Sequence, residues 1–215
     1  MESIVTEVRA LTESAFVLQF QRNGVVFEPG HHLHVGIPGS VDVREYSVFS
    51  GINDNYLEIL VKEVDDGVVS AQLHGLRPGD GVQVHGPYGF FLLTNDYQKR
   101  KHYLVATGTG IAPFRCYARS AADFEYQVIH GVRSPEEQYA RDAFPAHRYT
   151  SCVSGGKTGD GDVFAGRVTD FLRGRDIDPD GLYYLCGNCD MIYEVYDILK
   201  SAGIGTKNIF AEVYF

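Results

Sequence analysis

Residues 1–90 contain short β-rich runs of hydrophobic residues mixed with polar ones. The runs are residues 3–10, 14–21, 32–38, 56–64 and 81–87. Turn-forming sequences such as RNG, EPG, NDN and RPGDG separate them. Many short strands at close spacing are typical of an antiparallel barrel or sandwich. We therefore predict an antiparallel β-barrel domain over residues 1–97.

The second half of the chain has a different pattern, in which strand-like and helix-like segments alternate. The strand-like segments are residues 102–108, 125–132, 147–154, 182–188 and 209–215. The helix-like segments are residues 112–122, 166–174 and 191–203. This alternation predicts βαβ units and an α/β domain with a doubly wound parallel sheet. Polar residues interrupt both patterns at 93–101, so we place this second domain at residues 98–215.

Composition narrows the class of protein. The chain has 215 residues, of which 44% are hydrophobic and 22% charged, as in ordinary globular proteins. Its net charge of −9 disfavours nucleic acid as a partner, because non-specific binding needs a basic surface. The sequence has no apolar run of the roughly 20 residues that a membrane span needs, and no signal-peptide pattern at its start. We therefore expect a cytoplasmic protein without a membrane or nucleic-acid partner.

The cysteines and clustered histidines do not predict a metal centre. The four cysteines, at positions 116, 152, 186 and 189, lack the C-x4-C-x2-C run of plant-type iron–sulfur proteins and the spacing of zinc fingers. The CGNC sequence leaves a redox dithiol or half of a metal site as minor alternatives. His32 and His34 share a strand face, but no carboxylate or cysteine is near them in the sequence. We interpret them as ordinary barrel residues and predict no metal.

Two glycine-containing turns precede helical segments. In VATGTGIAPF (105–114), Gly108 and Gly110 allow close approach of a phosphate, and Pro113 suits the first turn of a helix. The third glycine of G-x-G-x-x-G is missing, so a plain βα turn is the alternative. In DGVVSAQLHGLRPGD (66–80), Gly67 and Ser70 begin a second such helix, with a simple barrel-capping helix as the alternative.

The segment REYSVFSG (44–51) is an unusual strand. Arg44 and Tyr46 are two residues apart and share a face, and Ser47 follows immediately. A cation, an aromatic ring and a hydroxyl suit a ligand that is anionic at one end and flat at the other. An exposed polar strand end is the alternative. Elsewhere, Cys186 lies at the carboxyl end of a strand, where α/β proteins build active sites.

A barrel followed by an α/β domain, with these motifs in this order, resembles the ferredoxin–NADP reductase family over nearly the whole chain. REYS looks like the family's R-x-Y-S flavin motif, and GVVS like its G-x-x-S motif. GTGIAP resembles the pyrophosphate turn, and CGN the C-G motif beside the nicotinamide. AEVYF resembles the plant-type carboxyl end E-V-Y with one added residue, Phe215.

The resemblance implies FAD as a cofactor. It implies that Arg44 faces the diphosphate, that Tyr46 packs on the isoalloxazine and that the Ser47 hydroxyl lies near N5. An ideal strand would point Ser47 away from Tyr46, so the strand must end or twist there. At the flavin diphosphate the resemblance implies Gly67, Val68, Val69 and Ser70.

The resemblance also implies NADP(H) or NAD(H) as a second cofactor. Its expected contacts are Thr107, Gly108, Thr109, Gly110, Pro113, Arg133, Ser154, Lys157, Cys186 and Gly187. Gly155 stands where NADP-specific members often have arginine. We therefore expect NADPH and NADH both to serve, with NADPH favoured only modestly.

The function that the resemblance implies is electron transfer between NAD(P)H and a one-electron carrier protein, ferredoxin or flavodoxin. The implied catalytic residues are Ser47, Cys186, Glu212 and Tyr214. Either Tyr214 or Phe215 is expected to shield the flavin. The alternatives are a reductase of free flavin or another diffusible acceptor, and a reductase subunit of a larger electron-transfer complex.

Overall fold

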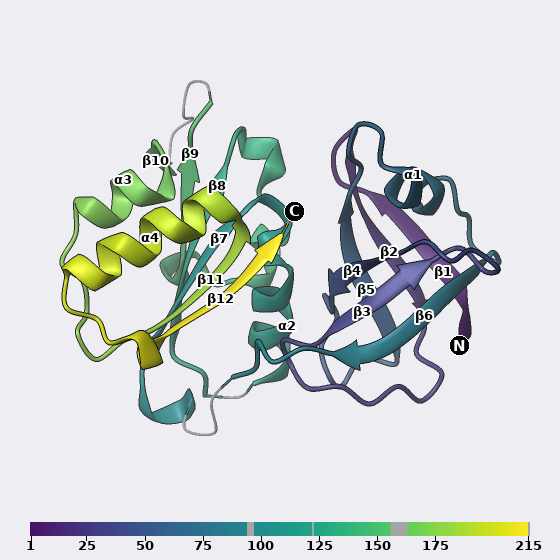
Figure 1. Ribbon diagram of the computed structural model, residues 1–215, viewed down its shortest axis with the longest axis horizontal. Coiled ribbons are helices and arrows are strands. Elements are labelled where there is room, and N and C mark those ends of the chain that lie inside the picture. The colour runs from purple at the N-terminus through teal and green to yellow at the C-terminus, as the bar shows by residue number, and fades with distance from the viewer. Residues whose placement is uncertain (94–96, 122, 156–162, 215) are drawn as a thin grey trace. The chain divides into compact units, whose positions relative to one another are not determined.

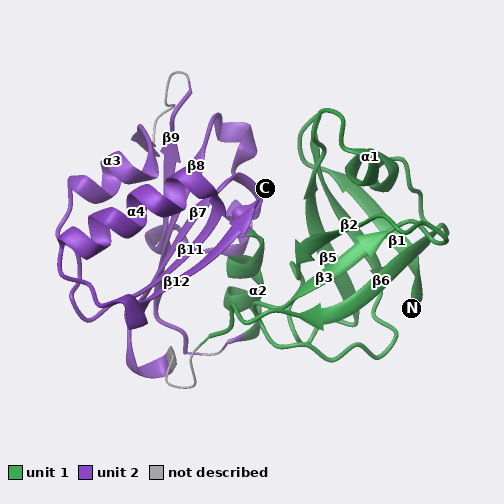
Figure 2. Ribbon diagram, viewed as in Figure 1, with its two compact units in different colours: residues 1–93, 112–120 green, residues 94–111, 121–215 purple. Residues whose placement is uncertain are grey.

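The computed structural model describes residues 1–93, 97–121, 123–155 and 163–214. The described chain forms two compact units, which Figure 2 shows in different colours. The first unit comprises Met1–Leu93 and Ala112–Ser120, and the second comprises Thr94–Ile111 and Ala121–Phe215. Our domain boundary between residues 97 and 98 stays a prediction. Lys157 and Phe215, two of the expected site residues, lie outside the described residues.

The first unit is built on an antiparallel six-stranded sheet with the order β4-β3-β6-β1-β2-β5 (Figure 1). Its strands are β1 (Glu2–Ala10), β2 (Ala15–Gln21), β3 (His32–Gly36), β4 (Val43–Ser47), β5 (Tyr56–Lys62) and β6 (Gly81–Tyr88). Just after β4, Val48 forms an antiparallel bridge with Ile59 of β5. This bridge joins the two ends of the sheet order, so the sheet closes into the predicted barrel.

Alternation along the strands decides which side chains form the barrel core. In β3, Leu33 and Val35 are fully buried, whereas His32 and His34 are half-buried on the opposite face. Helix α1 (Val68–His74) contributes Val69 and Leu73 to the same hydrophobic cluster. The GVVS segment therefore begins a short helix, as predicted, and that helix packs on the barrel core.

The second unit contains a six-stranded sheet with the order β10-β9-β8-β7-β11-β12, in which all neighbouring strands are parallel. Its strands are β7 (His102–Thr107), β8 (Tyr126–Val132), β9 (Tyr149–Val153), β10 (Val163–Ala165), β11 (Leu182–Asn188) and β12 (Ile209–Tyr214). The predicted parallel α/β class is confirmed. The order places β7, the strand before the glycine turn, beside β11, the strand that carries Cys186.

Helices α3 (Val168–Arg173) and α4 (Cys189–Ser201) lie side by side on one face of this sheet (Figure 1). Their apolar residues share a core with those of the sheet, including Val105, Leu185 and Val195. Helix α4 begins two residues earlier than the predicted segment, because the Asn188 side chain caps it by accepting from the amides of Asp190 and Met191.

Three features of the fold differ from the sequence analysis or extend it. The short strand β10 was not expected, and neither was the series of 3₁₀ turns between β8 and β9. Helix α2 (Ala112–Ser120) groups with the barrel and not with the parallel sheet.

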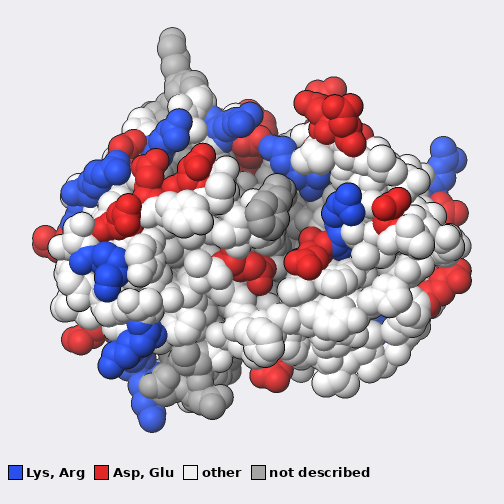
Figure 3. Space-filling model, viewed as in Figure 1, with Lys and Arg blue, Asp and Glu red and all other residues white. Residues whose placement is uncertain are grey.

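In the described ranges, no helix is both long enough and apolar enough to cross a membrane. On the face shown in Figure 3, acidic and basic side chains are interspersed on both units.

Candidate functional site

Most of the expected nicotinamide-nucleotide residues lie along one edge of the parallel sheet. Because parallel strands share a direction, the carboxyl ends of β9, β8, β7, β11 and β12 follow one another along this edge. In this order the edge carries Ser154, Arg133, the turn at Thr107–Gly110, Cys186–Asn188 and Glu212–Tyr214. The sequence spreads these residues over about half of the chain, and the sheet order brings them into one row.

The turn after β7 is built for close approach of another group. It is a 3₁₀ turn, η2 (Gly108–Ile111), and Gly108 has a positive φ of 52°. A Cβ on Gly110 would collide with the carbonyl of Cys186, and one on Gly187 (φ 126°) would collide with the Thr107 hydroxyl. The Thr107 hydroxyl also accepts a hydrogen bond of 3.0 Å from the Asn188 amide. The GTG and CGN motifs are therefore packed directly against each other.

A buried histidine that the sequence analysis did not single out holds this turn. His130 of β8 is completely buried, and its Nε2 lies 2.8 Å from the carbonyl oxygen of Gly108. A carbonyl can only accept, so Nε2 carries the proton. Burial lowers the pKa of His130 to about 4, although the Gly108 carbonyl acts in the opposite direction. The ring is thus neutral near pH 7, and its Nδ1 accepts from the Tyr149 hydroxyl at 2.8 Å.

Three of the expected catalytic residues meet on β11 and β12. The register of these strands pairs Cys186 with Glu212 and Asn188 with Tyr214. Burial raises the pKa of the Cys186 thiol well above its ordinary value, and the Glu212 carboxylate raises it further. A side-chain hydrogen bond with Tyr214 opposes this shift. Cys186 is therefore a protonated, neutral thiol at physiological pH, which makes it a poor nucleophile.

Two of the expected nicotinamide-nucleotide contacts, Arg133 and Ser154, follow the ends of β8 and β9, and the Glu137 carboxylate lies beside them. The Ser154 hydroxyl donates to the Val132 carbonyl at 3.2 Å. The Arg133 amide donates to Glu137 Oε2 at 2.9 Å. A Cβ on Gly155 would lie 2.8 Å from the Arg133 carbonyl oxygen, so an arginine at position 155 would require the backbone to shift. No local sequence pattern predicted an acidic group at this position.

The REYS segment lies in the first unit, on strand β4. The strand ends at Ser47, as the geometry of the motif required, and the Ser47 side chain is buried. The Arg44 side chain is exposed and donates to the Val43 carbonyl at 2.8 Å. Burial raises the pKa of Tyr46 to about 12, against the effect of Arg44, so its hydroxyl stays protonated. The segment therefore offers a solvent-accessible cation beside a neutral aromatic ring.

The GVVS segment presents less to a ligand than its motif suggests. Val69 is buried in the barrel core, and the Ser70 hydroxyl donates to the Gly67 carbonyl at 3.2 Å. Gly67 and Val68 line a hollow of about 710 Å³. Four carboxylates also line this hollow, those of Glu13, Glu63, Asp65 and Asp66. An anionic diphosphate here would depend on backbone amides, because the side chains around the hollow repel it.

Matches to known families agree with this geometry. Residues 2–92 match the model described as "Oxidoreductase FAD-binding domain", and residues 104–197 match "Oxidoreductase NAD-binding domain". Together the two models cover more than half of the chain. The protein is therefore an FAD-based oxidoreductase that exchanges electrons with NAD(P)H. The chain belongs to the ferredoxin–NADP reductase family. The expected fold, family and pair of cofactors are confirmed.

Individual relatives show the range of this family. The toluate 1,2-dioxygenase electron transfer component of Pseudomonas putida is 28% identical over 99% of this chain and 67% of the relative. A ferredoxin–NADP reductase of Azotobacter vinelandii is 27% identical over 93% of this chain and 89% of the relative. The structure of a ferredoxin NADP+ reductase from Neisseria gonorrhoeae with bound FAD and NADP has a TM-score of 0.86. It is 22% identical, with 100% of this chain and 98% of that one covered.

The described residues fit the two cofactors to different degrees. At Gly108 a Cβ would meet nothing within 4 Å, so the backbone there is open to a pyrophosphate, and α2 begins directly after the turn in the sequence. Arg44 and Tyr46 fit an anionic, flat ligand such as FAD. The acidic hollow beside α1 fits a diphosphate poorly on its side chains alone.

Proposed function

We propose that this chain is a ferredoxin- or flavodoxin-linked NAD(P)H reductase. The observation that carries the proposal is the single sheet edge on which Thr107–Gly110, Cys186–Asn188 and Glu212–Tyr214 meet. This edge offers a phosphate-binding turn, a neutral thiol and a carboxylate in one row. The turn can bind a pyrophosphate, and the thiol and carboxylate can orient a nicotinamide ring and hold a proton.

FAD supplies the redox chemistry when it is bound, because a flavin exchanges a hydride with a nicotinamide and single electrons with a carrier protein. The chain's residues bind and orient the cofactors. In the first unit, Arg44 binds the diphosphate, Tyr46 supports the flat ring and Ser47 hydrogen-bonds to its edge. The backbone of Gly67, Val68, Val69 and Ser70 supplies amides to the diphosphate.

In the second unit, Thr107, Gly108, Thr109, Gly110 and Pro113 form the pyrophosphate site. Arg133, Ser154 and Lys157 contact the adenosine end. Cys186 and Gly187 contact the nicotinamide ring, and the neutral thiol of Cys186 orients the ring by packing and weak hydrogen bonding. Glu212 is half-buried and is the group placed to hold or move a proton. We assign the shielding of the flavin to either Tyr214 or Phe215.

The test is steady-state reduction of ferredoxin, flavodoxin and free FMN, each measured with NADPH and with NADH. We expect a yellow protein that contains FAD and not FMN, and that reduces a carrier protein without any other subunit. Reduction of free FMN alone would instead make the chain a reductase of diffusible acceptors. Turnover only in the presence of a further protein component would make it a subunit of a larger complex.

A further inference from the structure

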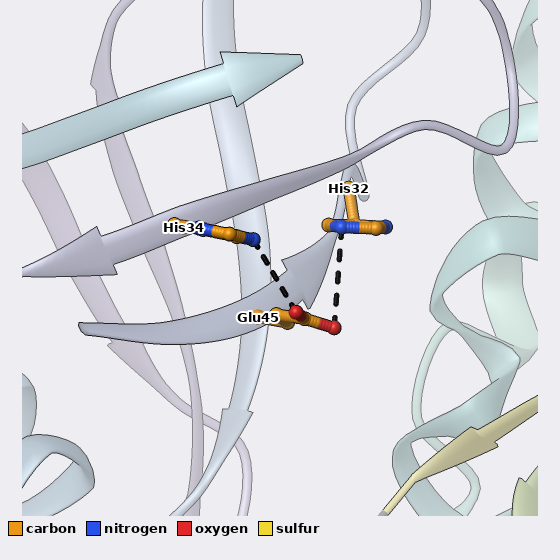
Figure 4. Close-up of side chains that lie close together, drawn as sticks. All are labelled: His32, His34 and Glu45. Carbon is orange, nitrogen blue, oxygen red and sulfur yellow. Dashed lines mark ion pairs between the residues drawn. The ribbon is translucent and has the colours of Figure 1, made fainter. Parts of the chain in front are cut away.

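Two histidines and a glutamate form a cluster on the outer face of the barrel. His32 and His34 alternate with the core residues Leu33 and Val35 along β3, so both imidazoles leave the strand on its outer side. The register of β3 with β4 places Glu45 directly opposite His34. Antiparallel partners share a face, so the carboxylate joins the two imidazoles (Figure 4).

The distances within this cluster suit a shared ion better than direct hydrogen bonds. Nε2 of His34 lies 3.3 Å from Oε1 of Glu45, and Nε2 of His32 lies 3.9 Å from Oε2. Both separations exceed the roughly 2.7–3.2 Å of a normal N–H···O hydrogen bond. Ligands on a tetrahedral zinc ion, with bonds of about 2.0–2.1 Å, lie about 3.4 Å apart. One ligand atom from each of the three side chains already lies within 4.8 Å of the others.

The orientation and surroundings of the imidazoles also favour a ligand role. The two rings are nearly parallel, with an interplanar angle of 10° and centroids 5.6 Å apart, so they face the same space. Tyr88 packs on the ring of His34 at 4.7 Å. Gly89, with φ 103°, leaves room for the other ring, because a Cβ there would lie 2.8 Å from Nδ1 of His32.

Charge in the cluster attracts a cation. The Glu45 carboxylate supplies a negative charge, and each imidazole offers a nitrogen lone pair to a cation. The imidazole side chains are 17% and 32% exposed and the carboxylate 69%, so an ion can enter from solvent.

We propose that His32, His34 and Glu45 bind a divalent transition-metal ion of the zinc class, with water completing the coordination. The two imidazole nitrogens and one carboxylate oxygen are a donor set that zinc accepts, and the open fourth position suits an exposed site. The ion links β3 to β4. On its other face β4 carries Arg44 and Tyr46, so the metal braces the strand that holds these residues.

The test is calorimetric titration of the untagged, FAD-loaded protein with ZnSO4 after removal of metals by a chelator. We expect one zinc ion per chain and a higher melting temperature in its presence. Glu45→Gln and His34→Gln should each weaken binding by about tenfold or more, because each removes one of three protein ligands. Glu45 is exposed, so its variant tests the site without disturbing the core.

Two control variants keep the result specific to this cluster. His74→Gln removes a histidine that also contacts a glutamate, since Nδ1 of His74 lies 2.5 Å from Glu63. That pair lacks a second imidazole, so zinc affinity should stay within about twofold of the wild-type value. Cys189→Ser controls for binding at the CGNC sequence. The proposal is overturned if zinc does not bind at millimolar concentration, or if either control variant weakens binding as much as Glu45→Gln does.

Discussion

Replacement of Arg115 by methionine should destabilise the protein far more than the same replacement of Arg119. Both arginines lie on α2, and both pair with a carboxylate of the barrel unit. The Arg115 side chain is 12% exposed and its partner Glu58 is 4% exposed. Arg119 is 36% exposed and its partner Asp54 is 17% exposed. Methionine keeps most of the apolar stem, so the comparison isolates the charged head group.

The magnitude follows from what Arg115 leaves behind. Its guanidinium is 2.8 Å from Glu58 Oε2 and 2.6 Å from the Phe49 carbonyl, and it stacks on the Phe49 ring at 4.0 Å. Removing one partner of a buried pair costs about 3–5 kcal/mol, because the other charge stays buried. Glu58 keeps a hydrogen bond from Gln19 at 3.2 Å and an ion pair with Arg9 at 3.9 Å, so we expect the lower end, about 3 kcal/mol. Arg119→Met should cost about 1 kcal/mol or less, as exposed pairs do.

Urea denaturation followed by far-ultraviolet circular dichroism measures both values, since the chain has no tryptophan to report unfolding. A double variant, Arg115→Met with Glu58→Gln, provides a check on the mechanism. It should be more stable than Arg115→Met alone, because the buried side chain at position 58 is then neutral and no longer needs the close cation that Arg115 supplied. Equal costs for Arg115→Met and Arg119→Met, or no recovery in the double variant, would refute the reasoning.

Four further predictions concern the sheet edge. His130 has a pKa near 6.5 in the unfolded chain and about 4 in the native protein, so its contribution of about 3 kcal/mol to the free energy of unfolding is present above pH 6.5 and is lost as the pH falls to about 4. His130→Phe should flatten the dependence of stability on pH between these values, and an unchanged dependence would contradict the assignment. Glu212→Gln should slow flavin reduction in stopped flow more than it weakens nucleotide binding, whereas an unchanged rate would make Glu212 structural. Glu137→Gln should raise the ratio of kcat/KM for NADPH to that for NADH by about tenfold, the equivalent of about 1.4 kcal/mol, and no change would place the 2′-phosphate elsewhere. Cys186→Ser should reduce the turnover rate, whereas Cys189→Ser should leave it nearly unchanged. An equal loss of turnover in both variants would favour a redox-active dithiol.

Neighbouring residues supply matched controls for two of these variants. His147→Gln removes an exposed histidine from the 3₁₀ turn before β9 and should leave the acid profile unchanged. Glu136→Gln removes the exposed carboxylate next to Glu137 and should leave the ratio of the two nucleotides nearly unchanged. Effects in these controls as large as those in the test variants would mean that net charge, and not position, is responsible.

The sequence by itself determined the two classes of sheet and most of the helices. Alternation with a period of two marks a strand with one buried face, and an apolar run followed by a helical pattern marks a βαβ unit. Both patterns are local, so they predict strands and helices even when the pairing of the strands is unknown. The end of β4 at Ser47 could be anticipated for the same reason, because Tyr46 and Ser47 cannot share a face of a regular strand. The short strand β10, with three residues, carries too little pattern to be recognised.

Only the tertiary structure decided which distant side chains act together. Glu45 is eleven positions beyond His34 in the numbering, and the register of β3 with β4 alone makes it the carboxylate that the histidines lacked. His130 looked like an ordinary strand residue until the order of β7 and β8 placed its ring under the Gly108 carbonyl. The acidic groups beside Arg133 and around α1 were equally hidden, because loops position them. Strand pairing and loop closure are long-range choices, made by the packing of the whole core, and no local pattern encodes them.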